Sequence, residues 1–373
     1  MFAIHGAIAG GLFTRIPWIS DHLGLTPATL GIALVFPAIG ACTTMPIAGR
    51  ILYRFGGRAA VRALLVSWCV CGALPALAPS LPTLCAAFFL GGAAAGMTDV
   101  VMNANGVQVQ ERVGHSIMSG LHGMWSVGTL LASAVGAFAA HEGVDARAHL
   151  GAVSALLVIV SALVCRHLLD TRPDPLAQPP PRFALPPRAL LPIALVGFCA
   201  IFAEAASGDW SGVYLRHVAG ASAGVAAASY TAFACTMAAV RLSGDLVIRR
   251  LGPVLTVRLG GALAVTGGLV IVWARSPVPA IAGFALVGVG IAAVVPLAFS
   301  AAGNSSASAG RGIAGMATVI YAASLIGPGV IGTLGSATSL SVSFGLITAL
   351  VAVLVFGAGA LRPGQGGAER ARG

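Results

Sequence analysis

Apolar runs of about twenty residues fill this chain almost from end to end, and no other feature constrains its fold as strongly. Only 9% of the residues are charged, whereas roughly 25% are charged in a soluble domain. As helices, runs of this length match the thickness of the hydrocarbon core of a bilayer. The sequence therefore predicts an all-α membrane protein.

The apolar runs are separated by short joints that contain proline or glycine, which commonly end helices. We predict twelve membrane-spanning helices, over approximately 1–19, 28–52, 59–79, 82–110, 116–140, 147–168, 189–216, 222–249, 254–275, 278–302, 312–335 and 338–361. The proline-rich stretch 170–188 predicts an extended linker between two six-helix bundles, 1–169 and 189–361, and a tail follows over 362–373.

The basic residues orient these predicted spans. All 21 of them are arginines. Sixteen fall in joints after even-numbered spans or in the tail, and four fall on the opposite side, at Arg15, Arg147, Arg216 and Arg275. Arg241 lies within a predicted span and is not counted. Because arginine-rich joints stay in the cytoplasm, both termini and the linker are predicted to be cytoplasmic. The arginines are not interleaved with aromatic residues on one polar face, so we expect the lipid bilayer and not a nucleic acid as their partner.

One segment of the chain occurs twice. The stretch from Ala41 to Gly56 returns in altered form from Ala234 to Gly252, and the two final glycines are 196 positions apart (252 − 56). Each copy is an apolar stretch that leads into a glycine, an arginine and a turn glycine. Membrane proteins with two similar halves usually work by rocking one half against the other. The repeat therefore predicts a transporter with two pseudo-symmetric bundles.

The joint after the second predicted span resembles the signature of the major facilitator superfamily, Gly-x-x-x-Asp-Arg-x-Gly-x-Arg. Gly49, Arg54, Gly56 and Arg58 match it, and Tyr53 replaces the aspartate. The stretches 15–19, 99–106 and 209–210 resemble the bacterial fucose-permease-like branch of that superfamily. The resemblance covers nearly the whole chain. It implies the twelve-helix fold, alternating access and residence in the cytoplasmic (inner) membrane of a bacterium.

The same resemblance implies a cytoplasmic latch, in which an acid and an arginine hold one bundle against its neighbour in one state. The four matched signature residues are its candidates in the first half, where Tyr53 leaves the acid missing. In the second half, Arg241 and Asp245 are four positions apart and share a helix face, so they are expected to pair. The alternative is a pair that merely extends its charges toward the membrane surface.

Asp99 is the first candidate for a functional carboxyl at membrane depth. It lies near the middle of the predicted span 82–110, on a stripe of one helix face made by Gly92, Gly96, Asp99, Asn103, Gly106 and Gln110. An ionisable group in lipid is costly unless it faces a cavity or a partner. We expect Asp99 and Asn103 to face a central cavity. The alternative is a carboxyl that is hydrogen-bonded to a neighbouring helix.

Two further acids lie in the predicted span 189–216. Glu204 is near its middle, where a carboxyl suits proton coupling, and it is expected in the central cavity. Asp209 is predicted either to join that cavity or to act as an outer-gate or structural acid that faces Arg15.

The span 116–140 contributes His122 and Trp125, which share a helix face. An aromatic ring beside polar groups suits a sugar-like substrate, and ordinary packing is the alternative. His5 and Tyr321 are lesser candidates.

Together these features predict a monomeric secondary active transporter, in which Asp99 or Glu204 couples a small polar solute, sugar-like for example, to the proton gradient. A proton-driven exporter of a metabolite or drug is the alternative. An intramembrane enzyme or a sensor is a third option. No HExxH or GxSxG motif occurs and the histidines are scattered, so we expect neither catalysis, nor a metal, nor a cofactor.

Overall fold

The computed structural model describes residues 1–113, 117–169, 187–305 and 309–362, and these residues form helices and no strand. The helices are α1 (Phe2–Phe13), α2 (Ile16–His22), α3 (Pro27–Phe55), α4 (Gly57–Cys71), α5 (Leu74–Leu77), α6 (Leu81–Val113), α7 (Met118–His141), α8 (Ala146–Val164), η1 (Cys165–His167), η2 (Arg188–Leu190), α9 (Leu191–His217), α10 (Ala223–Trp273), α11 (Pro277–Ile291), α12 (Val294–Ser305), α13 (Ala309–Ala337), α14 (Leu340–Gly357) and η3 (Ala358–Leu361).

These helices confirm the twelve predicted spans. Within the described residues, ten helical segments are long and apolar enough to cross a membrane, with α10 counted as two of them. The α1–α2 pair and α13 complete the twelve. The predicted span 1–19 is broken after Phe13. Pro17, in the first turn of α2, has no N–H to continue the hydrogen bonding of α1. The predicted linker 170–188 and tail 362–373 lie almost wholly outside the described residues.

The repeat predicted from the sequence is preserved in the backbone. Gly56 turns the chain between α3 and α4 with φ 78° and ψ 162°. Gly252 turns it within α10 with φ 73° and ψ 163°. Glycine has no Cβ and adopts a positive φ without strain, which explains why both copies keep it at this turn. The same turn therefore recurs at equivalent places in the two halves.

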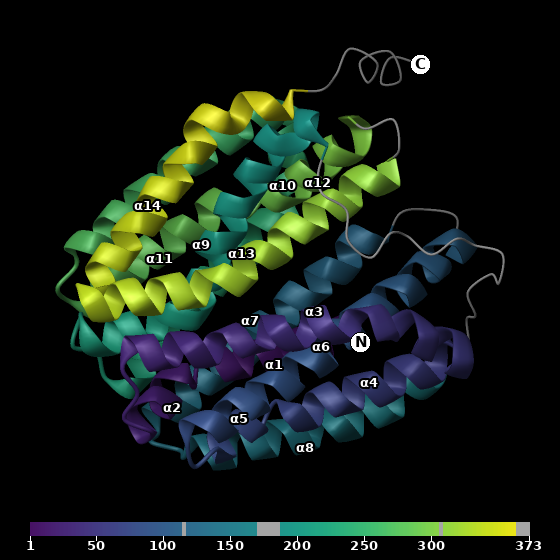
Figure 1. The fold of residues 1–373 in the computed structure, drawn as a ribbon, viewed down its shortest axis with the longest axis horizontal. Helices are drawn as coiled ribbons and strands as arrows, with labels where there is room; N and C mark the ends of the chain where they lie inside the picture. Colours follow the sequence, from purple (N-terminus) through teal and green to yellow (C-terminus); the bar gives the residue numbers. More distant parts are fainter. Residues whose placement is uncertain (114–116, 170–186, 306–308, 363–373) are drawn as a thin grey trace.

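The two halves of the chain form two helical bundles. In Figure 1, the N-terminal half (α1–α8, purple to blue) lies below the C-terminal half (α9–α14, teal to yellow). Glycines bring helices within each bundle into backbone contact. A Cβ at Gly92 of α6 would lie 2.0 Å from the carbonyl oxygen of Pro37 in α3. Small residues at helix contacts are typical of membrane bundles and allow this close approach.

The polar contacts that the structure describes between the halves gather at one end of the molecule. Asp21 forms ion pairs with Arg216 and His217 there, at 3.1 and 3.2 Å. The backbone N–H of Ala28 donates to Ser336 Oγ at 2.8 Å. We call this the Asp21 end. At the opposite Gly56 end, where the signature joint lies, Tyr53 is 60% exposed.

Candidate functional site: a central cavity between the two halves

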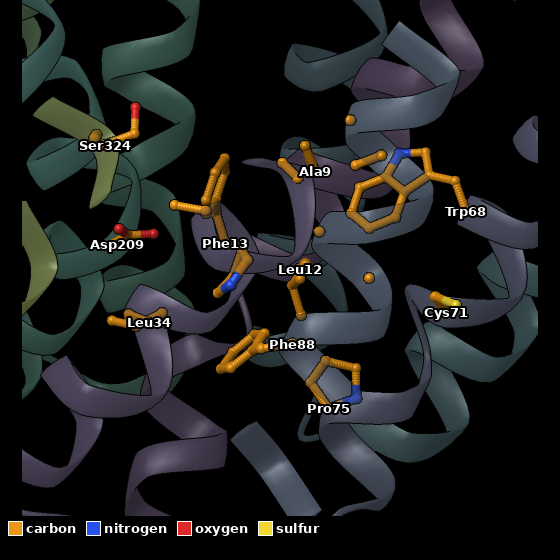
Figure 2. Close-up of a pocket in the computed structure, with 18 of the residues that line it drawn as sticks. Ala9, Leu12, Phe13, Leu34, Trp68, Cys71, Pro75, Phe88, Asp209 and Ser324 are labelled. Atoms are coloured by element: carbon orange, nitrogen blue, oxygen red, sulfur yellow. The ribbon is translucent and has the colours of Figure 1, made fainter. Parts of the chain in front are cut away.

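A cavity of about 350 Å³ lies between the halves. Figure 2 shows Asp209 of α9 and Ser324 of α13 on one side of it and Trp68 of α4 on the other. Helices α1, α2, α3, α5 and α6 supply the rest of the described lining. A volume of this order suits a small organic molecule.

The cavity walls are mostly apolar and aromatic. Phe13, Trp68 and Phe88 line it, together with Tyr321. The ring of Phe13, from the N-terminal half, lies 4.8 Å from the ring of Tyr230 in α10, so this side chain bridges the two halves. Flat apolar walls of this kind pack against the faces of a ring.

Asp99 lines the cavity from the N-terminal half, as the sequence predicts. Asn103, one turn further along α6, donates its Nδ2–H to Asp99 Oδ1 at 3.0 Å. Gly92 and Gly96 also line the cavity, and both pack closely on α3. The predicted stripe therefore combines helix packing with a polar site. At its far end, Gln110 Oε1 accepts from the N–H of Ile117 at 2.9 Å, which links α6 to α7.

Asp209 lines the cavity from the C-terminal half, and Figure 2 shows its carboxylate among the lining side chains. Among the described residues it has no hydrogen bond or ion pair. Arg15, the partner that the sequence suggested as an alternative, donates its Nε–H to His149 Nδ1 at 3.1 Å instead. Asp209 thus presents an unpaired negative charge to the cavity when it is ionised.

Glu204 has a different environment from the two cavity acids. Arg241 Nη2 lies 3.0 Å from both Glu204 Oε1 and Glu204 Oε2. Each side chain of the pair is 23% exposed. The cavity lining includes the adjacent Ala205 but not Glu204. The sequence predicted that Arg241 pairs with Asp245, whose side chain lies outside the described residues. The charge of Glu204 is therefore balanced within the C-terminal half.

His122 and Trp125 are not part of the cavity lining, but Trp125 contacts a residue that is. Trp125 donates its Nε1–H to His5 Nδ1 at 3.0 Å, and His5 lines the cavity. The other nitrogen of His5, Nε2, lies 3.2 Å from the carbonyl oxygen of Ala95. An indole only donates and a carbonyl only accepts, so His5 is held neutral with its hydrogen on Nε2. His122 packs edge-on against Phe2, with ring centroids 5.3 Å apart.

The signature residues of the predicted latch lie at the Gly56 end. Arg54 lies over the ring of its neighbour Phe55, 5.5 Å from the centroid. Arg58 donates its Nε–H to the carbonyl oxygen of Leu168 at 2.7 Å. Gly49 has open space around it. In the part of the chain that the structure describes, neither arginine forms an ion pair with an acid.

The sequence reasoning missed the ion pairs of the Asp21 end. Asp21 and Arg216 are 195 positions apart (216 − 21), close to the offset of 196 between Gly56 and Gly252. They therefore occupy equivalent ends of the first span in each half, with opposite charges. The opposite charges at these two repeat-related positions could have predicted the ion pair, because equivalent ends of two related halves can meet at the axis that relates them.

The chain is similar in sequence and in fold to known membrane transporters. A sequence profile described as Major Facilitator Superfamily matches residues 1–328. An uncharacterised transporter of Sinorhizobium fredii is 34% identical over 361 residues, which cover 95% of each chain. The membrane protein MosC of Rhizobium meliloti is 30% identical over 364 residues, covering 94% of this chain and 88% of its own.

Solved structures share the fold at low sequence identity. The nucleoside transporter NupG superimposes with a TM-score of 0.73 and 12% identity, covering 96% of each chain. A bacterial homologue of the human lysosomal transporter Spinster, solved in an inward-facing and occupied conformation, superimposes with a TM-score of 0.68 and 14% identity. That match covers 96% of this chain and 93% of the other. Identities this low establish the twelve-helix arrangement alone.

Proposed function

This chain belongs to the Major Facilitator Superfamily and is a multi-pass membrane transporter, and from this premise we propose that it moves a small polar solute by alternating access, coupled to protons. The solute binds in the 350 Å³ cavity between the halves. The observation that carries the proposal is the pair of carboxyls, Asp99 and Asp209, which line one cavity from opposite halves. No lysine or arginine lies in the described lining to balance them.

Coupling follows from what these two carboxyls need. An ionised carboxylate at membrane depth requires a cation or a proton. Asp99 has an amide partner, Asp209 has none among the described residues, and His5 is held neutral. Protons are therefore the simplest counter-charge when the cavity closes. Glu204 differs from these two acids, because Arg241 already balances its carboxylate, so we assign that pair to structure within the C-terminal half.

Alternating access is supported by the distribution of contacts between the halves. The ion pairs of Asp21 and the hydrogen bond from Ala28 to Ser336 hold the Asp21 end together. The excess of arginine at the Gly56 end assigns that end to the cytoplasm. On this proposal the structure represents an inward-facing state, and the transporter works as a monomer in the inner membrane of a bacterium. The inward-facing state of the Spinster homologue supports this assignment.

The solute is a ring-bearing polar molecule, sugar-like for example, because aromatic walls stack on rings while the carboxyls accept hydrogen bonds from hydroxyl groups. NupG, whose fold this chain shares, is a nucleoside transporter. The second candidate is an exporter of a small organic amine. The largely apolar lining with two acids and no described basic side chain favours it.

Uptake into proteoliposomes with an imposed pH gradient tests the proposal. The panel contains monosaccharides, nucleosides and organic amines. We expect one class to accumulate and to lose its accumulation when the gradient is collapsed. Asp99→Asn and Asp209→Asn should each abolish accumulation, whereas Glu142→Gln, an exposed acid at the Asp21 end, should not.

Two results would refute parts of this proposal. Transport that is unaffected by collapsing the gradient would refute proton coupling. Normal accumulation by both asparagine variants would refute the assignment of the cavity acids, even though the fold stands.

A further inference from the structure

A second hollow lies on the outer surface of the N-terminal half. It is a groove of about 510 Å³ between α4 and α8. In Figure 1 these two helices lie on the side of the N-terminal bundle that faces away from the C-terminal half. The groove therefore faces lipid and has no part in the central cavity. We call it the α4–α8 groove.

Two arginines stand at the mouth of this groove. Arg58 and Arg62 are one helical turn apart on α4 and line it, and both are exposed. Arg62 forms no hydrogen bond or ion pair with any described residue, and no acid is part of the described lining. Two adjacent guanidinium groups that have no anionic partner among the described residues are suited to binding a phosphate group.

The floor of the groove is made by small apolar residues. Ala59, Ala63 and Val66 of α4 lie opposite Val158 and Ala162 of α8. The groove residues on α4 run from Arg58 to Val66, which is about 12 Å along a helix, and Phe55 at the end of α3 borders them. One leaflet of the hydrocarbon core is about 15 Å thick. The groove thus has the length of an acyl chain segment within one leaflet.

The groove residues are not conserved between the two halves of the chain. At the positions 196 further along, leucines replace the two alanines, Leu255 for Ala59 and Leu259 for Ala63, and Val254 replaces Arg58. Arg258 alone is kept, in place of Arg62. In the C-terminal half, larger side chains therefore occupy the positions of the groove alanines, and one of the two positive charges is absent.

We propose that the α4–α8 groove is a binding site for one anionic phospholipid of the leaflet at the Gly56 end. Its phosphate lies between Arg58 and Arg62, and one acyl chain lies along Ala59, Ala63 and Val66. The charge complementarity of the mouth selects an anionic headgroup, and the apolar floor selects a lipid over a soluble phosphate.

Native mass spectrometry of the purified full chain tests this site. The probes are dioleoylphosphatidylglycerol, dioleoylphosphatidylcholine and inorganic phosphate. We expect one phosphatidylglycerol to bind in preference to phosphatidylcholine. Arg62→Gln should weaken that binding about fivefold, the effect of one arginine at an anionic surface. Ala63→Leu, which copies Leu259 of the other half, should weaken it without any change of charge.

Arg258→Gln is the matched control, because it removes the repeat-related arginine from the surface where leucines replace the two groove alanines, and it should leave the binding within about twofold. Equal binding of phosphatidylcholine, or an equal loss in the control, would overturn the proposal. Displacement of the lipid by inorganic phosphate would assign the arginines to a soluble anion instead. If Ala63→Leu does not fold, the comparison of Arg62→Gln with Arg258→Gln still tests the proposal. All of these variants are compared by lipid binding and not by transport activity, so the result does not depend on the proposed function.

Discussion

The contact of α3 with α13 predicts how the transporter can be trapped in one conformation. Gly332 of α13 lies against the N-terminal half at the Asp21 end. A Cβ at this position would lie 2.4 Å from the carbonyl oxygen of Pro27 and 2.8 Å from the Cα of Gly31. Gly332→Ala therefore places a methyl group where the closed end has no room for it.

The magnitude follows from this overlap. Carbon atoms make optimal contact at about 3.5–4.0 Å, so the methyl group is about 1 Å too close to two backbone atoms. Overpacking of this kind costs about 1–3 kcal/mol. The overlap exists only while the Asp21 end is closed, because both partners belong to the other half. The variant should therefore shift the equilibrium about 5- to 150-fold toward states that are open at this end.

Distances between spin labels measure that equilibrium. The labels are placed at Thr26 and Thr338, on the two halves at the Asp21 end, after the seven native cysteines have been replaced. We expect the ratio of short to long distances to fall in Gly332→Ala by the factor given above. Gly345→Ala is the matched control, because a Cβ at Gly345 of α14 meets open space.

An unchanged distance distribution in Gly332→Ala would show that the contact yields without opening the end. An equal shift in Gly345→Ala would show that the effect does not depend on the contact. Either result refutes the steric argument.

Three further predictions follow from the structure. Asp21→Asn should raise the open population about two- to thirtyfold in the same distance measurement, because its two exposed ion pairs contribute about 0.2–1 kcal/mol each, and 1 M salt should remove the difference from the parent. Glu204→Gln should lower the midpoint of thermal unfolding by leaving Arg241 unpaired, and the double variant with Arg241→Gln should recover part of that loss; an additive loss would contradict the pairing. Gly56→Ala should destabilise the chain by about 1–2 kcal/mol in a detergent unfolding assay, since φ is 78° at this turn, and an unchanged midpoint would argue against strain there.

Much of the fold could be predicted because hydropathy and helix breakers are local. The predicted span 28–52 corresponds to α3, and the turn glycines Gly56 and Gly252 mark the same joint in both halves. The break after Phe13 was missed, because it depends on how α1 ends before Pro17. Proline alone does not settle this, since Pro37 and Pro46 lie inside an unbroken α3.

The candidate site could be predicted only in part, because pairing between helices depends on their rotation and tilt. Asp99 was placed in a cavity from its helix face, and the cavity lining contains it. The partner of Arg241 was predicted on its own helix, but the structure pairs it with Glu204 on α9. Local spacing could not reveal that contact, and it also could not reveal that Trp125 reaches His5 across to α1.

The hydrogen bond from Ala28 to Ser336 bears on how quickly the two halves can separate. The N–H of Ala28 lies in the first turn of α3, where a helix supplies no acceptor, and Ser336 of the other half satisfies it at 2.8 Å. Both groups lie near the molecular surface, so water replaces each partner as soon as the halves part. Parting therefore conserves the number of hydrogen bonds, and the bond guides the halves back into alignment while adding little to the barrier that limits turnover.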